Sequence, residues 1–306
     1  MSSMSTLITE PGVELPKTLF GYEVLDYIGQ GAGSRIYVVS HADTHQIYAL
    51  KHVIRTTDRD ERFVEQLEAE YEVGRLVNHP GLRRSIDVKV NRTLLRKTID
   101  ACLIMELVDG TPLESTPPKS VLDTVDCFIK VAEGLLALHQ LGYVHCDLKP
   151  NNILRNGAGE VKVIDLGQAC KTGTVKTRIQ GTPDFISPEQ VRCQEVTGRT
   201  DVFNFGATLY WCLTGRKLPT LFNIKKSETS FLVDSEIPTP RSLNPGVPET
   251  LSNFVMECVK TNPAKRPEMT DCARRLEIMQ HVLLRNARPA ARAHTAMHAG
   301  MIAQAG

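Results

Sequence analysis

The chain has 306 residues, of which 42% are hydrophobic and 23% charged, and its formal net charge is +1. This length fits one large domain or two lobes that share a cleft, and the composition is that of a folded globular protein. The nearly neutral charge gives no reason to expect nucleic acid or an anionic membrane as a partner. The eight cysteines form no CxxC pair, so neither a zinc site nor a thioredoxin-like motif is indicated.

Residues 1–18 are polar and contain two prolines, so we interpret them as a flexible leader. They lack the basic stretch and apolar core of a secretory signal. No run in the chain approaches the ~20 apolar residues of a membrane-spanning helix. A chain of this size needs no disulfide bonds, and reduced thiols are the simpler assumption. We therefore expect a cytoplasmic protein with no membrane span.

Three runs rich in β-branched and aromatic residues follow, at 22–28, 35–40 and 47–53. They predict a small antiparallel sheet. The first connection reads IGQGAGSRI, and its glycines allow the backbone to approach a phosphate closely. A strand follows this loop and no Gly-Lys-Ser or Gly-Lys-Thr ends it, which disfavours a dinucleotide-binding loop and a P-loop. The remaining interpretation of this loop is a glycine-rich hairpin that folds over a triphosphate.

Two charged residues lie on packing elements of this region. Lys51 is inside the third strand run, and Glu70 shares one helical face with apolar residues of the segment 58–77. In isolation, either side chain is readily explained by exposure to solvent. The alternative is that Lys51 is directed at phosphate and that Glu70 holds it there.

The second half of the chain is mainly helical by pattern. Residues 120–141 predict a long amphipathic helix that is capped by Ser120, and 201–214 and 249–259 predict two more. From about residue 285 the composition is mostly Arg, Ala, His and Gly, which indicates a mobile tail.

The segment 143–167 concentrates the polar residues that suit phosphate chemistry. Its Asn-Gly turn predicts a hairpin of strands 153–155 and 160–164, whose outer ends would bring Asn152 and Asp165 together. One amide oxygen and one carboxylate suit magnesium, which also takes phosphate oxygens and water. Just upstream, Asp147 and Lys149 provide a group that can orient a nucleophile and a cation for the phosphoryl oxygens.

YALK, HCDLKPNN, DLG and SPE occur in this order, and with them the chain resembles the eukaryotic-type serine/threonine protein kinases, in a bacterial-like form, over about residues 20–285. The resemblance implies an α+β, bilobal protein kinase fold: a small antiparallel β-sheet lobe with one helix and a larger, mainly α-helical lobe. We place the leader at 1–18, the N-lobe at 19–106, the C-lobe at 107–285 and a disordered tail at 286–306.

The resemblance also implies ATP and Mg²⁺ as cofactors and assigns roles to residues. Asp147 and Lys149 match the catalytic aspartate and the lysine that contacts the γ-phosphate, and Asn152 and Asp165 match the metal ligands. Residues that match the nucleotide-binding positions, including the hinge, are Ile28, Gly29, Gly31, Ser34, Ile36, Ala49, Lys51, Glu70, Met105, Glu106, Val108 and Leu154.

Three further residues resemble structural positions of the family. Glu189 and Arg266 would form a buried ion pair that anchors the activation segment, the loop between Asp165 and Glu189. Asp201 would tie a helix to the catalytic loop around Asp147. Cys146 departs from the family, which often has an arginine before the catalytic aspartate to bind a phosphorylated activation-loop residue. We therefore expect activity that does not depend on phosphorylation of that loop. For Cys146 and Cys170, packing is favoured over a redox role.

Two alternatives belong to other classes. A pseudokinase-like module that binds ATP and signals through its conformation typically lacks the lysine or a metal ligand, and here all are present. A small-molecule kinase of related fold would lack the extended region GTPDFISPEQ, which resembles a peptide-positioning loop. The expected partners are therefore ATP and protein substrates that present serine or threonine, and no feature of the sequence indicates an oligomeric state.

Overall fold

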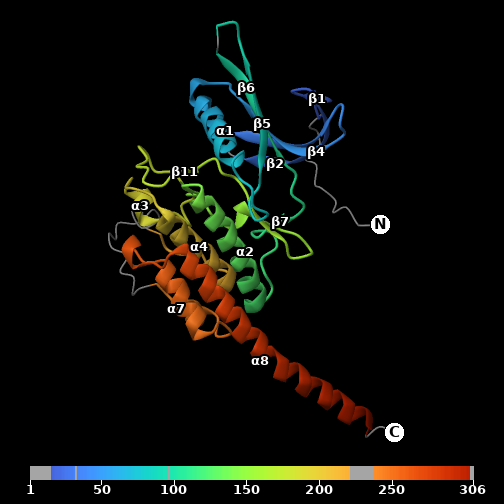
Figure 1. The fold of residues 1–306 in the computed structure, drawn as a ribbon, viewed down its shortest axis with the longest axis vertical. Helices are drawn as coiled ribbons and strands as arrows, with labels where there is room; N and C mark the ends of the chain where they lie inside the picture. Colours follow the sequence, from blue (N-terminus) through green and yellow to red (C-terminus); the bar gives the residue numbers. More distant parts are fainter. Residues whose placement is uncertain (1–14, 32, 96, 221–236, 304–306) are drawn as a thin grey trace. The chain divides into compact units, whose positions relative to one another are not determined.

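The structure is a computed structural model that describes residues 15–31, 33–95, 97–220 and 237–303, with backbone only from residue 287 onward. The chain divides into two units (Figure 1). Unit 1 contains residues 1–110 and 164–169, and unit 2 contains residues 111–163 and 170–306. The short segment that carries Asp165 therefore belongs to unit 1.

A six-stranded antiparallel sheet forms most of unit 1, in the strand order β1-β2-β3-β4-β6-β5. Glycine and polar turns separate runs of β-branched and aromatic residues, which favour strands. The strands are β1 (Thr18–Leu19), β2 (Tyr22–Gly31), β3 (Ser34–His41), β4 (Ile47–Ile54), β5 (Ser85–Arg92) and β6 (Thr98–Glu106).

The helix α1 (Glu61–Gly74) covers one face of this sheet, after the short turn η1 (Asp58–Asp60). Val64 and Leu67 of the helix pack against apolar residues of β4 and β6 that point to the same side. The alternate residues of the same two strands, such as Leu50, pack in a second cluster. Both clusters hold β4 in place, so a polar side chain on this strand has a fixed position.

Unit 2 is mainly helical. Its longer helices are α2 (Val121–Gln140), α4 (Gly198–Thr214), α7 (Glu249–Cys258) and α8 (Met269–Ala303). The helix α2 packs against α4 and α8, and α4 also packs against α7. The shorter helices are α3 (Pro188–Val191), α6 (Pro240–Leu243), η2 (Pro150–Asn152) and η3 (Pro263–Lys265).

Two small antiparallel sheets position the polar loops of unit 2. One has the order β10-β9-β7, and the other pairs β11 with β8. Their strands are β7 (Thr111–Pro112), β8 (Tyr143–Val144), β9 (Ile153–Arg155), β10 (Val161–Val163) and β11 (Cys170–Lys171). The predicted hairpin of β9 and β10 is confirmed.

The three predicted strands and three predicted helices are also confirmed, within a few residues at their ends. Ser120 caps α2 as expected, because its side chain accepts a hydrogen bond from the backbone of Asp123. Of the predicted leader 1–18, residues 1–14 lie outside the described residues. Among the helices of the described residues, none has an apolar stretch of the length that a bilayer span requires.

The backbone of α8 continues to Ala303, whereas the sequence predicts a mobile tail from residue 286. The alanines and arginines of this stretch have high helix propensity, which explains a helical backbone there. Its side chains from residue 287 onward lie outside the described residues, and the mobility of this stretch stays a prediction.

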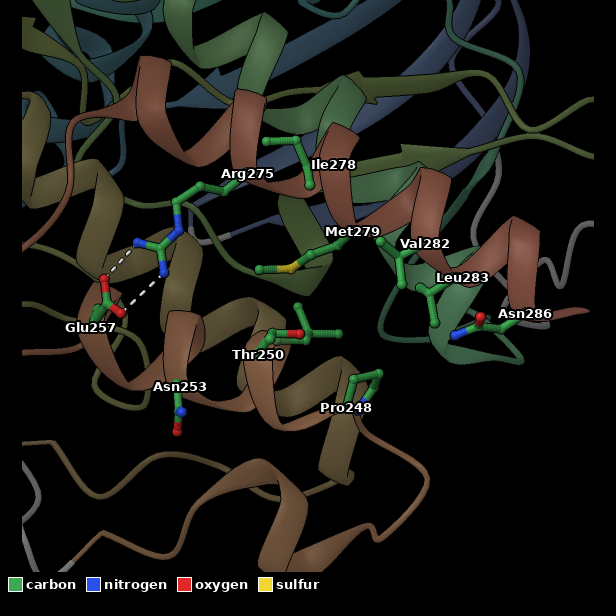
Figure 2. A pocket seen from close by; sticks show the side chains of 11 residues that line it. Pro248, Thr250, Asn253, Glu257, Arg275, Ile278, Met279, Val282, Leu283 and Asn286 are labelled. Carbon is green, nitrogen blue, oxygen red and sulfur yellow. Dashed lines mark hydrogen bonds and ion pairs between the residues drawn. The ribbon is translucent and has the colours of Figure 1, made fainter.

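An apolar cavity of about 540 Å³ lies between α7 and α8 (Figure 2). Met279, Val282 and Leu283 of α8 line it, together with Leu251 of α7. None of the predicted site residues is among its lining residues.

Candidate active site

Lys51 is the central cation of a polar cluster in unit 1. It lies in the middle of β4, and its Nζ atom donates to Oε2 of Glu70 at 2.7 Å and to Oδ1 of Asp165 at 3.4 Å. The helical period that puts Glu70 on the packed face of α1 also directs its carboxylate toward the sheet. The expected contact between Lys51 and Glu70 is therefore present, and neither side chain is simply turned to solvent.

Glu70 has a second cationic partner that the sequence analysis missed. Arg83 donates from Nη2 to Oε1 of Glu70 at 3.2 Å, so each oxygen of this buried carboxylate faces one cation. Burial alone would lower the pKa of Lys51, but the charges of Asp165 and Glu70 raise it above its ordinary value. Lys51 therefore stays a cation at neutral pH, in a fixed position.

The glycine-rich loop is the tip of the hairpin of β2 and β3. Gly29 lies opposite Ile36, and Gly31 lies opposite Ser34. The hydroxyl of Ser34 is buried, and it has no hydrogen-bond partner among the described residues. Buried hydroxyls are normally hydrogen-bonded. A phosphate oxygen would supply the missing partner, so this loop fits the phosphates of a nucleoside triphosphate.

Gly33 shows why this loop needs glycine. Its φ of +72° lies in the left-handed region, and a Cβ atom there would come within 2.6 Å of the ring of Phe63 in α1. A side chain would therefore be strained both by the backbone and by the packing of the loop on α1.

The other predicted nucleotide-binding residues of unit 1 border the same strands. Ala49 pairs with Met105 across β4 and β6, and both side chains are buried. Glu106 ends β6 and Val108 follows it, while Ile28 of β2 is exposed. Leu154, which the sequence analysis groups with them, belongs to β9 of unit 2.

Unit 2 holds the predicted catalytic residues in one cluster. Lys149 donates from Nζ to Oδ2 of Asp147 at 3.0 Å and to Oγ1 of Thr182 at 2.8 Å. Thr182 in turn donates to Oδ1 of Asp147 from its backbone nitrogen and from its hydroxyl, both at 2.8 Å. Three groups from two loops thus fix the orientation of one carboxylate. Thr182 lies in the region GTPDFISPEQ, and its contact with Asp147 was not among the expectations drawn from the sequence.

Asn152 is buried beside this cluster. Its Nδ2 atom donates to the backbone carbonyl of Asp147 at 2.9 Å, which leaves the amide oxygen as the atom suited to a metal ion. The other predicted ligand, Asp165, belongs to unit 1, so the expected approach of the two residues stays a prediction. Among the described residues, no cluster of three or more His, Cys, Asp or Glu side chains could hold a metal ion by itself.

Asp201 of α4 supports the backbone just before the catalytic loop. It accepts hydrogen bonds from the backbone nitrogens of His145 at 2.8 Å and Cys146 at 2.9 Å, and it contacts Nε2 of His139 at 2.8 Å. Burial would raise the pKa of Asp201, but His139 and the other donors hold it below its ordinary value. A charged, buried carboxylate therefore fixes this backbone.

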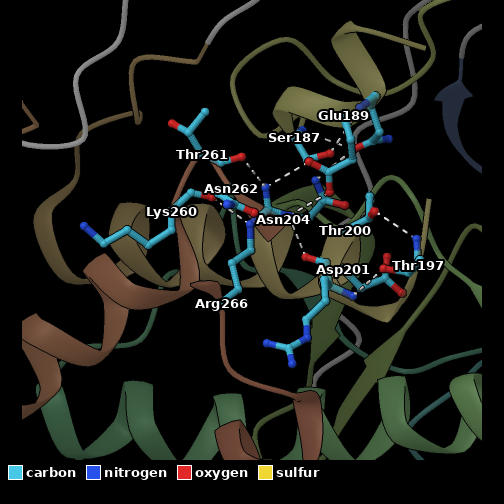
Figure 3. Close-up of polar contacts among 12 residues, drawn as sticks. Ser187, Glu189, Thr197, Thr200, Asp201, Asn204, Lys260, Thr261, Asn262 and Arg266 are labelled. Atoms are coloured by element: carbon cyan, nitrogen blue, oxygen red, sulfur yellow. Dashed lines mark hydrogen bonds and ion pairs between the residues drawn. The ribbon is translucent and has the colours of Figure 1, made fainter. Parts of the chain in front are cut away.

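Glu189 and Arg266 form the ion pair that the resemblance predicts (Figure 3). Nη1 and Nη2 of Arg266 donate to the two carboxylate oxygens at 2.7 and 2.9 Å, and both side chains are buried. Arg266 also donates to three backbone carbonyls and lies over the ring of Phe203. The segment that carries Glu189 is thereby joined to the loop before α8.

A family model for the protein kinase domain matches residues 22–278 of this chain. The match covers most of the sequence, and the chain belongs to the protein kinase family.

Curated relatives are bacterial proteins named as serine/threonine-protein kinases. The chain is 28% identical to PknB of Mycobacterium leprae over 258 residues, which cover 80% of this chain and 40% of the relative. It is 25% identical to PrkC of Bacillus subtilis over 261 residues, which cover 82% and 39%. It is 29% identical to PknK of Mycobacterium tuberculosis over 255 residues, which cover 81% and 22%. The chain therefore spans two fifths or less of the length of these relatives.

Proposed function

We propose that this chain transfers the γ-phosphate of ATP to serine and threonine hydroxyls of protein substrates. The observation that carries the proposal is the arrangement of Asp147, Lys149 and Thr182 in unit 2. A carboxylate with one cation and two hydrogen-bond donors fixed on it can orient a hydroxyl nucleophile and receive its proton. The names of the bacterial relatives support serine and threonine as the acceptors.

Each unit supplies a distinct part of the reaction. In unit 1, Lys51 would bind phosphate oxygens while Glu70 keeps it in place, and the glycine-rich loop with Ser34 would cover the triphosphate. In unit 2, Asp147 would hold the substrate hydroxyl, and Lys149 would stabilise charge on the transferred group. Asn152 and Asp165 provide the hard oxygen atoms that would hold Mg²⁺, which neutralises phosphate charge when bound.

We also propose that phosphate transfer does not require phosphorylation of the activation segment. Two features of the chain support the proposal. Position 146 is a cysteine and offers no cation to a phosphate. In the structure, Thr182 still contacts Asp147. The pairing of β11 with β8 and an isolated antiparallel β-bridge between the backbones of Val175 and Glu195 also hold the segment in place. The loop is thus positioned by bonds that involve no phosphate group.

A variant with Thr172, Thr174 and Thr177 changed to valine, prepared without any prior phosphorylation, tests this element. We expect it to retain transfer activity within about threefold of the wild type, because a switch through a phosphate would be worth far more. Loss of transfer with an unchanged melting temperature would contradict the proposal.

We also propose the cytoplasm as the location. All eight cysteines are free in the structure, although Cys146 and Cys170 lie in contact, which fits a reducing compartment. The partners would be ATP and protein substrates, with no nucleic acid.

The reaction itself is tested by incubating the full chain with γ-labelled ATP, Mg²⁺ and a generic basic protein, followed by phosphoamino-acid analysis. We expect phosphoserine or phosphothreonine, and a loss of about 10² to 10³-fold in rate for Lys149→Met. Phosphotyrosine as the main product, or an unchanged rate in the variant, would overturn the assignment. A pseudokinase would bind ATP and give no labelled product in either protein.

A further inference from the structure

Two cysteines of unit 2 lie in contact next to the catalytic loop. The Sγ atoms of Cys146 and Cys170 are 3.7 Å apart, although the residues are 24 positions apart in the sequence. Cys146 immediately precedes Asp147, and Cys170 lies in β11, at the start of the segment that leads to Thr182. Their contact therefore joins the two loops that together orient the catalytic carboxylate.

The backbone on both sides of this contact is fixed. Cys146 adopts a φ of +65°, and its nitrogen donates to Asp201 while its carbonyl accepts from Gln190. Cys170 lies directly opposite Val144 in the two-stranded sheet. These bonds hold the two thiols in contact, so a disulfide requires a short approach of the two sulfurs and no unfolding.

The two sulfur atoms differ in exposure and in acidity. Cys146 is fully buried, whereas Cys170 is partly exposed. The hydrogen bond with Cys146, followed by the charge of Lys176 and a hydrogen bond of Thr174, lowers the pKa of Cys170 to about 7 despite partial burial. The same hydrogen bond and burial raise the pKa of Cys146 well above its ordinary value. This is the pairing of a reachable thiolate with a neighbouring thiol that favours oxidation.

A second pair of cysteines provides an internal comparison. Cys258 and Cys272 also interact, but both are fully buried, and burial raises the pKa of Cys258 well above its ordinary value. That pair lacks an accessible sulfur. Proximity of two thiols alone therefore does not distinguish the first pair, whereas exposure does.

We propose that Cys146 and Cys170 are a redox modification site, which a peroxide converts to a disulfide that lowers the proposed kinase activity. The Cys170 thiolate attacks one oxygen of the peroxide, which gives a sulfenic acid and releases hydroxide or alkoxide. The Cys146 thiol then attacks that sulfur, the S–S bond forms, and the hydroxyl leaves with the thiol proton as water. The two cysteines lose two electrons in total and the peroxide gains them. A thiol reductant reverses the step by exchange.

The effect on activity follows from the distance between the sulfurs. A disulfide requires an S–S length of about 2.05 Å, so the two sulfurs must approach each other by about 1.6 Å. Asp147 is the next residue in the chain, and a displacement of about 1 Å in a catalytic group can cost about 10²-fold in rate. This part of the inference rests on the proposed function, whereas disulfide formation does not.

The modification is tested on the full chain by treatment with hydrogen peroxide, alkylation of the remaining thiols and peptide mapping by mass spectrometry. We expect one peptide pair linked through Cys146 and Cys170, and no link between Cys258 and Cys272. Dimedone should trap a sulfenic acid at Cys170 in Cys146→Ser, and the link should persist in Cys193→Ser, which removes another partly exposed cysteine. Absence of the Cys146–Cys170 link in the peroxide-treated wild type would overturn the proposal, whatever the state of the other cysteines.

The functional effect is tested by transfer of labelled phosphate before and after peroxide, and after dithiothreitol. We expect a loss of at least tenfold that dithiothreitol restores, and Cys170→Ser should keep its activity in peroxide while Cys193→Ser should not. Equal inactivation of Cys170→Ser and the wild type would overturn the regulatory role. If the reduced wild type transfers no phosphate, the proposed function fails, and peptide mapping still decides whether the disulfide forms.

Discussion

Replacing Arg266 by methionine should destabilise unit 2 strongly, because it leaves the buried carboxylate of Glu189 without its partner. The guanidinium makes two hydrogen bonds to that carboxylate and three to backbone carbonyls, and its side chain is 0% exposed. Methionine fills a similar volume and removes all five donors. The variant therefore isolates the charge and the hydrogen bonds from the packing.

Breaking one side of a buried ion pair costs about 3–5 kcal/mol. At roughly 2–4 °C per kcal/mol for a domain of this size, the melting temperature should fall by about 6–20 °C. Arg275 provides a matched control, since it also makes two hydrogen bonds to a glutamate, Glu257, and lies over a phenylalanine ring, but these side chains are 31% and 44% exposed. Arg275→Met should cost about 1 kcal/mol or less.

Urea denaturation followed by circular dichroism measures both variants against the wild type. The double variant Glu189→Gln with Arg266→Met should recover part of the loss, because no uncompensated charge remains buried. Equal destabilisation by Arg266→Met and Arg275→Met would refute the reasoning, because the Arg266 side chain is buried and also donates to three backbone carbonyls, whereas the Arg275 pair is partly exposed.

Three further changes test other parts of the structure. Gly33→Ala should raise the KM for ATP about tenfold, from strain of about 1–2 kcal/mol plus the clash with Phe63, and Gly33→Ala with Phe63→Ala should recover the part due to the clash. Thr182→Val should lower kcat about 10²-fold with little change in melting temperature, whereas Thr182→Ser should retain activity. Asp201→Asn should lower the free energy of unfolding at pH 7 by about 1–3 kcal/mol. Folding lowers the pKa of Asp201, so the stability that its charge adds is present above its unfolded-state pKa and is lost as the pH falls through its folded-state pKa. In urea titrations the two proteins should therefore begin to converge only below about pH 4.

Much of the fold was predictable because the hydrophobic pattern is strong. The strand runs around Lys51 have β-branched residues and clear turns, and the amphipathic pattern of α1 placed Glu70 on a packed face. The contact between these two residues could therefore be expected once the family resemblance was stated.

Other features depend on contacts that leave no local pattern. Arg83 lies between α1 and β5, outside any periodic segment, so nothing in the sequence indicates that it shares Glu70 with Lys51. The contact of Cys146 with Cys170 depends on two strands of two residues each, which are too short for a periodic signal. A left-handed backbone at Cys146 is likewise imposed by tertiary hydrogen bonds and not by the residue itself.

The most direct test of the central claim compares the wild type with Asp147→Asn in transfer of labelled γ-phosphate from ATP, with and without Mg²⁺. ATP binding is measured in parallel by calorimetry, so that folding and nucleotide affinity are controlled. We expect Mg²⁺-dependent phosphoserine or phosphothreonine in the wild type and a loss of at least about 10²-fold in the variant, with ATP binding retained. Equal transfer by both proteins, or ATP binding without transfer by the wild type, would contradict it.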